Sequence, residues 1–144
     1  PSTAFATASS STQTYAAANA VDGNAGTYWE SANNAFPQTL TVDLGAARSV
    51  DRVVVKLPPG WERRTQTLSV LGSTDGSIWT TLKASAGYTF DPATGNAVSI
   101  PLPAGERRHL RLSVTGNTGW PAGQVAEFEV YGPTGTTPPP TTTP

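Results

Sequence analysis

Apolar and polar residues alternate along much of the chain, and this period of two is typical of β-strands with one buried face. The segments that show it are residues 4–9, 38–45, 49–57, 67–73, 78–82, 97–100, 109–115 and 125–131. In residues 49–57 the apolar centre is continuous, which indicates burial on both faces in part. About eight short strands at regular spacing predict an all-β fold, a β-sandwich or jelly roll of two antiparallel sheets.

Glycine, proline and asparagine mark the turns between these strands. Asp75-Gly76 predicts a hairpin turn, and the Pro-Pro-Gly sequence of residues 58–60 ends the strand before it. We also expect Pro101 and Pro103 to end a strand. The other segments expected to be loops are residues 10–18, with one short helical turn, 87–92 and 116–123.

The composition agrees with a β domain and argues against several kinds of partner. The chain has 144 residues, enough for one domain with one core, and only 13% of them are charged. The net charge is −1, and basic residues adjoin only in the pairs Arg63-Arg64 and Arg107-Arg108. Nucleic acid and anionic membranes require more concentrated positive charge. No apolar run approaches the roughly 18 residues of a membrane span, and there is no cysteine for a disulfide or a thiolate site.

The chain divides by composition into a module, residues 1–132, and a tail, residues 133–144, that consists only of proline, threonine and glycine. Such a tail is typical of the semi-rigid linkers that join secreted modules. The sequence also begins without Met and without a signal peptide. We therefore expect a monomeric module excised from a secreted, extracellular protein with a further domain beyond the linker.

The loop at residues 19–31 gathers oxygen-bearing side chains on a tightly turning segment. Asp22, Asn24 and Thr27 are spaced two and three residues apart, and calcium is held in proteins by six to eight such oxygens. The alternating carboxylates of an EF-hand are missing. The loop alone leaves two interpretations open: a cation site that needs a second carboxylate from elsewhere, or an Asx-turn whose polar groups bond their own backbone.

Three motifs in order make the sequence resemble a known family. They are Asp-Gly-Asn…Thr…Trp at residues 22–29, Ser-Thr-Asp-Gly-Ser-Ile-Trp at residues 73–79, and Ala-Glu-Phe-Glu-Val-Tyr-Gly at residues 126–132. Together they resemble the discoidin, or coagulation factor 5/8 type C, superfamily over residues 4–132. The nearest bacterial members look like family 32 carbohydrate-binding modules, which have galactose-binding-like jelly rolls.

The resemblance implies a structural calcium ion where the early loop meets the last strand. Its ligands would be the carbonyls of Asn19, Asn24 and Ala126, the carboxylates of Asp22 and Glu127, and Thr27 through its carbonyl and hydroxyl. Two carboxylates among all-oxygen ligands suit Ca²⁺ better than zinc or copper. The disulfide that joins the ends of the vertebrate members is absent, since this chain has no cysteine.

The sequence offers no catalytic constellation. Glycoside cleavage uses two carboxylates about 5–10 Å apart across a cleft, but the resemblance assigns Asp22 and Glu127 to the metal. Serine chemistry needs a base, and the only histidine, His109, begins a strand, where an edge or surface role is expected. We therefore expect a binding module and no enzyme.

Sugar recognition requires aromatic faces for the ring and polar groups for its hydroxyls. The loops that would meet at one end of the sandwich carry such residues. The carbohydrate-binding candidates are Trp61, Tyr88, Trp120, Arg63, Arg64, Glu30, Asn33, Asn34 and Asn117, with Glu62 nearby. Trp61 and Trp120 could instead cap the core. We expect Phe90 to be buried and Tyr88 exposed, and Trp29 and Trp79 to belong to the core.

The predicted function is a non-catalytic carbohydrate-binding module that anchors a secreted polysaccharide-degrading enzyme, such as a glycoside hydrolase, to its glycan. Glucans, chitosan-type polymers and galactosides all fit, and Glu30 and Glu62 would favour a cationic aminosugar. The alternatives are a cell-surface or protein adhesion module, which would need a broad apolar patch, and phospholipid binding through Trp61 beside Arg63-Arg64. A structural spacer without a ligand is the third.

Overall fold

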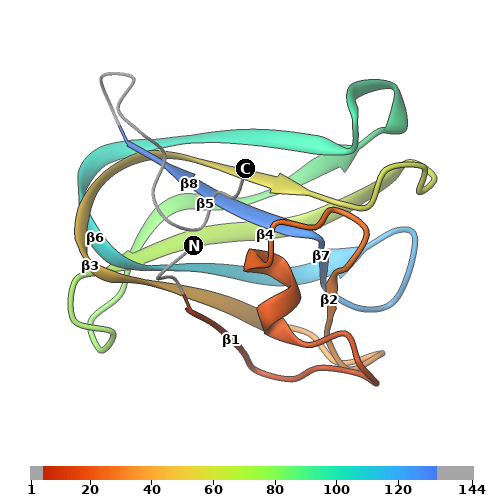
Figure 1. The fold of residues 1–144 in the computed structure, drawn as a ribbon, viewed down its shortest axis with the longest axis horizontal. Coiled ribbons are helices and arrows are strands. Elements are labelled where there is room, and N and C mark those ends of the chain that lie inside the picture. Colours follow the sequence, from red (N-terminus) through yellow and green to blue (C-terminus); the bar gives the residue numbers. More distant parts are fainter. Residues whose placement is uncertain (1–4, 133–144) are drawn as a thin grey trace.

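Figure 1 shows the computed structural model, which describes residues 5–132, and the all-β fold predicted from the sequence is confirmed. The strands are β1 (Phe5–Ala8), β2 (Trp29–Glu30), β3 (Gln38–Lys56), β4 (Arg64–Ser73), β5 (Thr80–Phe90), β6 (Ala97–Asn117), β7 (Gln124–Val125) and β8 (Glu127–Tyr131). Two short 3-10 helices are η1 (Ala17–Val21) and η2 (Pro92–Thr94). The predicted linker, residues 133–144, lies outside the described residues, as do residues 1–4.

Two long strands, β3 and β6, build both layers of the sandwich. Residues 38–43 of β3 and 109–114 of β6 pair in a layer with the strand order β1-β3-β6-β4-β5. Further along, residues 52–56 of β3 pair with β8 on one side and with the start of β6 on the other. Register shifts in the β3–β6 ladder mark the bends between the layers, at the left of Figure 1. All described strand pairs are antiparallel, including the small separate sheet of β2 and β7.

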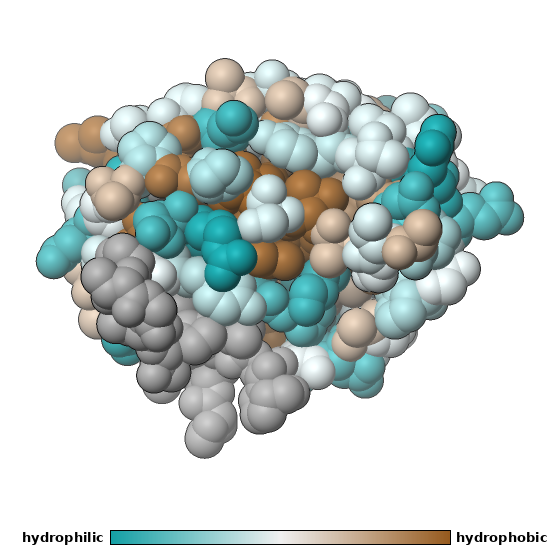
Figure 2. Space-filling view, turned by 90° about the horizontal axis from the view of Figure 1, so that it is seen from above, coloured by the Kyte–Doolittle hydropathy of each residue, from teal (hydrophilic) through white to brown (hydrophobic). Residues whose placement is uncertain are grey.

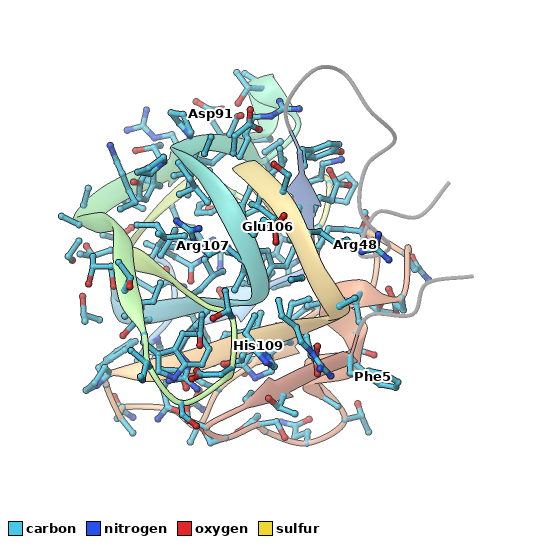
Figure 3. The ribbon with its side chains drawn as sticks, turned by 90° about the vertical axis from the view of Figure 1, so that its left-hand side faces the viewer. Phe5, Arg48, Asp91, Glu106, Arg107 and His109 are labelled. Atoms are coloured by element: carbon cyan, nitrogen blue, oxygen red, sulfur yellow. The ribbon has the colours of Figure 1, made fainter. Side chains whose placement is uncertain are left out.

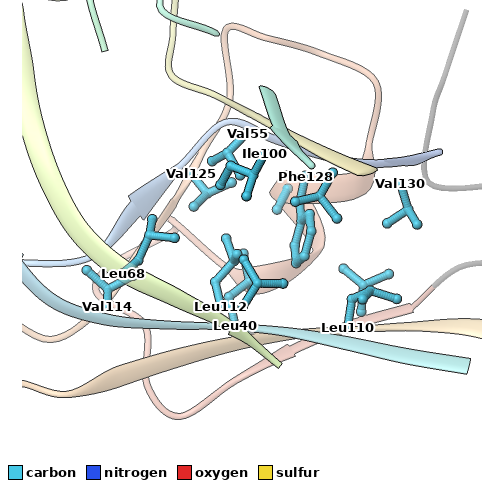
Figure 4. Close-up of a cluster of buried hydrophobic side chains, with 14 of the residues drawn as sticks. Leu40, Val55, Leu68, Ile100, Leu110, Leu112, Val114, Val125, Phe128 and Val130 are labelled. Carbon is cyan, nitrogen blue, oxygen red and sulfur yellow. The ribbon is translucent and has the colours of Figure 1, made fainter. Parts of the chain in front are cut away.

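The core lies between the two layers and is made by the inward positions of the alternating strands (Figure 4). Its largest fully buried side chains include Trp29, Phe90 and Phe128, together with leucines from β3, β4 and β6. Trp29 is also tied at its rim, because Nε1 donates to the Ser10 carbonyl at 2.9 Å. The predicted burial of Trp29 and Phe90 is confirmed.

The long strands correct the predicted boundaries. Residues 38–45 and 49–56 belong to the single strand β3, which ends one residue before the predicted boundary, and residues 97–100 and 109–115 belong to the single strand β6. Pro101 does not end its strand, because here β6 is an edge that pairs only with β3, so the missing N–H costs no ladder bond. The turn-forming residues therefore mark bends within strands as well as ends. Residues 87–90, predicted as loop, continue β5.

Trp79 corrects a second prediction, since it lies outside the core. It is half-buried on the outer side of β6, where its ring is 4.0 Å from the guanidinium carbon of Arg111 and 6.1 Å from the His109 ring. His109 and Arg111 are the outward positions that alternate with the buried Leu110 and Leu112. The strand period thus places the tryptophan on the outer face.

The surface is largely polar. Figure 2 shows one face from above, where hydrophilic and weakly polar residues surround a small apolar area. Figure 3 shows the end with the bends, where Arg48, Glu106 and Arg107 lie close to the curved parts of β3 and β6. In residues 5–132 no helix has the length and apolar character needed to cross a membrane.

Candidate functional site

A pocket of about 480 Å³ is lined by residues from the end of the sandwich opposite the bends. The loops of this end lie at the right of Figure 1. The walls of the pocket come from segments far apart in the sequence: the loop before η1, strand β2, the loop that leads into β4, and the loop between β6 and β7. The lining residues are Gln13, Tyr15, Tyr28, Glu30, Trp61, Glu62, Arg64, Trp120 and Gln124. We call it the loop-end pocket.

Aromatic rings form much of this pocket and hold one another in place. The Tyr15 and Tyr28 rings stack with centroids 4.5 Å apart, and the Tyr28 ring meets Trp61 edge-on at 4.6 Å. The guanidinium carbon of Arg64 lies 4.7 Å from the Trp61 ring centroid. Such edge, stacked and cation–π contacts each contribute about 0.5–1.5 kcal/mol. The pocket wall is therefore ordered before any ligand arrives.

Trp120 is the exposed ring of the pocket, with 48% of its surface accessible. Its Nε1 donates to the Asn33 side-chain oxygen at 3.1 Å, which links the β6–β7 loop to the loop after β2. The backbone N–H of Asn34 reinforces this link by donating to the Pro121 carbonyl at 2.7 Å. Trp120 thus presents its face to solvent while its edge is fixed, as a stacking platform requires.

A buried polar network centred on Gln124 forms the pocket floor. The Gln124 amide donates to Glu30 at 2.7 Å, and its side-chain oxygen accepts from Arg64 at 2.9 Å and from Asn117 at 3.1 Å. Gln66 fixes the Gln124 backbone through bonds of 2.8 and 3.0 Å. Because each partner restrains the others, the polar groups of the floor have one defined arrangement.

Tyr28 in the pocket wall remains neutral across the physiological pH range. Burial raises the pKa of Tyr28 far above its ordinary value, and the neighbouring Tyr15 hydroxyl and the Glu30 carboxylate add to the effect. A neutral phenol can both donate and accept a hydrogen bond, which is the chemistry that sugar hydroxyls need.

The structure brings together only part of the predicted carbohydrate site. Trp61, Trp120, Arg64 and Glu30 line the loop-end pocket. Asn33 and Asn117 do not line it but hold Trp120 and Gln124. The predicted residues that lie off its walls are Arg63, Asn34 and Tyr88. Trp61 lines the pocket and also packs against the core.

The prediction that Tyr88 is exposed is wrong. Tyr88 lies on β5 two residues before the buried Phe90, so both side chains are on the same face of the strand. Its ring packs against the core, its hydroxyl is buried without a partner in the described structure, and burial raises its pKa.

A second hollow of about 310 Å³ adjoins the loop-end pocket across the Tyr15–Tyr28 pair. Its other lining residues are Thr14, Asn19, Gly26 and Thr27, from the loop around η1. The stacked tyrosines are therefore a ridge with a concave surface on each side.

The Asp22 loop places several of the predicted metal ligands in contact. The Asp22 carboxylate accepts from the Asn24 backbone N–H at 2.9 Å and from the Thr27 hydroxyl, which also lies 3.0 Å from the Asn24 carbonyl. The Asn19 amide donates to the Tyr28 carbonyl at 3.1 Å and so joins the two ends of the loop. This geometry is compatible with an Asx-turn and with a ligand cage.

Glu127, the second carboxylate of the predicted metal site, lies in a largely buried position. It is 7% exposed, and burial, with the charges of Glu129 and Asp22, raises the pKa of its carboxyl to about 7. Lys56 pairs with Glu129 at 3.1 Å rather than with Glu127. Within residues 5–132 no three His, Cys, Asp or Glu side chains form a metal cluster. Two close carboxylates with loop carbonyls and a hydroxyl nevertheless fit a hard cation such as calcium, which would neutralise them.

The single histidine, His109, does not line this pocket. His109 faces Asp43 at 4.0 Å and the Trp79 ring on the outer side of the sheet (Figure 3). Neither a serine nor a cysteine nucleophile is bonded to it among the described hydrogen bonds. The geometry of the loop-end pocket is that of a binding site: fixed aromatic rings above a floor of fixed polar groups.

The fold and the pocket define a jelly-roll binding module. The family model of the F5/8 type C domain matches residues 5–128, and the chain belongs to this family. Its fold is that of the family 32 carbohydrate-binding modules, a non-catalytic class, as the solved structures show. No curated protein sequence matches the chain at a significant level.

Three solved structures illustrate the likeness. Chitosan-binding module 1 from a chitosanase/glucanase of Paenibacillus sp. IK-5 is 32% identical, with a TM-score of 0.71 over 90% of this chain and 95% of that one. The family 32 module of AlyQ, solved with 4,5-unsaturated mannuronic acid, is 27% identical, with a TM-score of 0.74 over 88% and 93%. A family 89 glycoside hydrolase from Clostridium perfringens contains the same fold, at 23% identity and a TM-score of 0.77, over 90% of this chain and 14% of that one.

Proposed function

We propose that this chain is a carbohydrate-binding module that holds an attached, secreted polysaccharide-degrading enzyme on its glycan, and that the loop-end pocket is the sugar site. The observation that carries the proposal is the pocket itself, where Trp61 and Trp120 stand beside the fixed polar groups of Arg64, Glu30 and Gln124. An aromatic face stacks on the C–H face of a pyranose, and fixed polar groups bind its hydroxyls.

The contacts that already restrain the pocket's side chains reduce the entropy lost on binding. Few side chains must be immobilised on binding, because rings and amides already restrain one another. The contact is nevertheless small, with two or three rings. We expect dissociation constants of about 10⁻⁵–10⁻³ M, or about −4 to −7 kcal/mol. Weak single-site binding is sufficient for a tethered module, since the tether raises the local concentration of enzyme at the polymer.

The comparisons support both parts of this proposal. The modules of similar sequence are described as binding chitosan and an unsaturated mannuronic acid, so the fold carries sugar sites of more than one chemistry. The Clostridium perfringens hydrolase carries the fold as a small part of a longer chain, which is the arrangement we propose for this module.

We separately propose that the chain binds a structural calcium ion. Asp22 and Glu127 would supply the carboxylates, Thr27 its hydroxyl and carbonyl, and Asn19, Asn24 and Ala126 their carbonyls. When bound, the ion supplies positive charge to two close carboxylates and links the Asp22 loop to β8. It would lie beyond the tyrosine ridge, so its role would be stability and not direct contact with the sugar.

The adhesion and phospholipid alternatives have less support. Of the exposed large apolar side chains in residues 5–132, which are Phe5, Phe36, Ile78 and Trp120, only Trp120 lines the loop-end pocket. Arg64 is bonded within the pocket floor, which leaves Arg63 as the exposed member of the basic pair. A membrane surface would require more basic and apolar residues together.

Affinity electrophoresis tests the proposal. The wild-type chain and Trp120→Ala would be run through gels that contain chitosan, β-1,3-glucan, galactan or alginate. We expect retardation of the wild type by at least one polymer and none of the variant. Ile78→Ala, which removes an apolar side chain that is more exposed than Trp120 and lies outside the pocket, should migrate as the wild type. The absence of wild-type retardation by every polymer in a wide panel would contradict the proposed function.

A further inference from the structure

The most unusual group in the loop-end pocket is the Glu30 side chain. It is 6% exposed and lines the pocket from β2. Its backbone is fixed on both sides, because its N–H donates to the Tyr15 carbonyl at 3.1 Å and its carbonyl accepts from Thr12 at 3.0 Å. The backbone from which the carboxylate projects is thus fixed, and the Gln124 amide holds the carboxylate itself at 2.7 Å.

Glu30 has no cationic partner within residues 5–132. Its one described side-chain bond is to the neutral amide of Gln124, at 2.7 Å. The described ion pairs involve only Lys56 with Glu129, and Arg108 and His109 with Asp43. Buried carboxylates in proteins are nearly always paired, since an uncompensated charge in a desolvated site is costly.

The arginine of the pocket does not neutralise this charge directly. Arg64 donates to the Gln124 side-chain oxygen at 2.9 Å and to the Glu62 backbone carbonyl at 3.2 Å, and its guanidinium lies over Trp61. Gln124 thus stands between Arg64 and Glu30. Counting Glu62 at the rim, two carboxylates and one guanidinium line the pocket, which leaves one net negative charge.

We propose that the loop-end pocket binds a sugar that carries a protonated amine, with the ammonium group at Glu30 and the sugar ring against the exposed tryptophan. The inference rests on the proposed function and names its substrate class: a polymer of 2-amino-2-deoxy sugars with free amines. The ligand then supplies the cation that the buried carboxylate lacks. A uronic acid would place its carboxylate against Glu30 and Glu62, and a neutral glucan would leave Glu30 uncompensated.

The test compares three β-1,4-linked hexamers that differ only at carbon 2: glucosamine, N-acetylglucosamine and glucose. Dissociation constants would be measured by isothermal titration calorimetry with the wild-type chain. A charge-assisted hydrogen bond contributes about 1.5–3 kcal/mol, so we expect the glucosamine hexamer to bind at least roughly tenfold more tightly than the other two.

Glu30→Gln is the diagnostic variant, because its amide oxygen can still accept from Gln124 while the charge is removed. We expect it to lose the preference for glucosamine, with a weakening of at least roughly tenfold for that hexamer. Glu62→Gln is the matched control, since it removes the same charge at the exposed rim, where screening by solvent limits the effect to about threefold or less. Thermal unfolding of each variant checks that it folds. The comparison of the three hexamers uses the wild type alone, so it tests the proposal even if a variant does not fold.

The outcomes separate this inference from the proposed function. Equal binding of the three hexamers, binding of galactan or alginate in their place, or an unchanged preference in Glu30→Gln would overturn the aminosugar assignment and leave carbohydrate binding intact. Failure to bind any glycan in the panel would contradict the proposed function itself.

Discussion

The two ends of the sandwich carry concave surfaces of opposite character. The loop-end pocket, about 480 Å³, has four aromatic side chains in its walls, Tyr15, Tyr28, Trp61 and Trp120. The hollow at the bends, about 290 Å³, is lined by Gly72, Ser73, Thr74, Asp75, Ile78, Thr80, Glu106 and Arg107, with no aromatic ring among them. The loop-end pocket and the hollow at the bends lie at the two ends of the same sandwich. Their difference therefore comes from the loops and side chains at each end and not from the two layers.

The difference follows from how the chain passes through each end. At the bends β3 and β6 run continuously from one layer to the other, and the Arg107 side chain fills the space beside the backbone (Figure 3). A Cβ on Gly72 or Gly105 would lie within 3 Å of Arg107 atoms. At the loop end, strand β2 and three separate loops converge with large side chains. Recognition is thus expected where the chain leaves the sheet.

The largest expected effect on function is loss of sugar binding in Trp120→Ala. Since about half of Trp120 is exposed, we expect the melting temperature to stay within about 2 °C of the wild type. Binding should fall below detection, because the module has few stacking rings and truncation of a central aromatic costs about 2 kcal/mol or more. Titration calorimetry with the best-retained glycan measures the loss. A destabilised variant would show that Trp120 supports the core, and Ile78→Ala at the other end should change neither property.

Calcium removal should distinguish the two Asp-Gly turns of the chain, Asp22-Gly23 and Asp75-Gly76. Asp75 is satisfied by its own turn: the Ser77 and Ile78 backbone N–H groups and the Ser73 hydroxyl donate to it and lower its pKa. Asp22 instead lies near the buried Glu127. With calcium at several hundred times its dissociation constant, chelation should lower the free energy of unfolding by about 3–4 kcal/mol.

Variants of the two turns provide the matched controls for that experiment. Asp22→Asn should abolish the response of the melting temperature to EDTA, whereas Asp75→Asn should respond as the wild type does. Sugar retention should change far less than the melting temperature. An equal loss of both on chelation would place the ion in the sugar site and contradict a structural role.

The pH dependence of the calcium-free chain is the next effect in size. The pKa of Glu127 is raised to about 7 in the folded chain, from an ordinary value of 4.5. The folded state therefore holds this proton more tightly than the unfolded state, and the stability so gained is complete below about pH 4.5 and is lost as the pH rises through 7. The loss amounts to about 3 kcal/mol.

Denaturant unfolding in EDTA at pH values between roughly 5 and 8 measures how the free energy of unfolding changes with pH. This range spans the shifted pKa of Glu127. Glu127→Gln should flatten it, and saturating calcium should remove it in the wild type. A calcium-free chain whose stability rises with pH across this window would contradict the account of Glu127.

The smallest effect concerns the edge of the Trp120 ring. Asn33→Ala removes the acceptor of the Trp120 Nε1–H, which leaves the ring less restrained without changing the stacking surface. We expect affinity for the best-retained glycan to weaken by about threefold, or about 0.5–1 kcal/mol. Titration calorimetry would show it, and an unchanged dissociation constant would mean that the bond does not order the ring for binding.

The sequence predicted the layers of the sandwich well because strand alternation is a local property. Inward positions such as Leu110 and Leu112 follow directly from the period of two. The same rule, applied to Tyr88 and Phe90, shows that they share a face, which the prediction of an exposed Tyr88 overlooked. Trp79 was misplaced because its motif identifies the turn but not the side of the sheet to which the ring returns.

The pocket was only partly predictable because its key contacts are long-range. Gln124 reads in the sequence as an ordinary polar residue before a strand, and its role depends on Glu30 and Arg64, which lie 94 and 60 residues away. Tyr15 and Tyr28 were missed in the same way, since the stack between them and the contact with Trp61 arise only when the loops converge. Exposed aromatics flanked by glycine and proline were the signal that did identify Trp61 and Trp120.

The most direct test of the account uses the four tryptophan indole N–H signals as reporters of the two ends. Nuclear magnetic resonance spectra of the chain would be recorded during titration with the glycan that retains it best. We expect the signals of Trp120 and Trp61 to shift with the same saturation curve, while that of Trp79, on the outer face near the bends, stays in place. Shifts at Trp79 with unperturbed Trp61 and Trp120 would contradict a sugar site in the loop-end pocket.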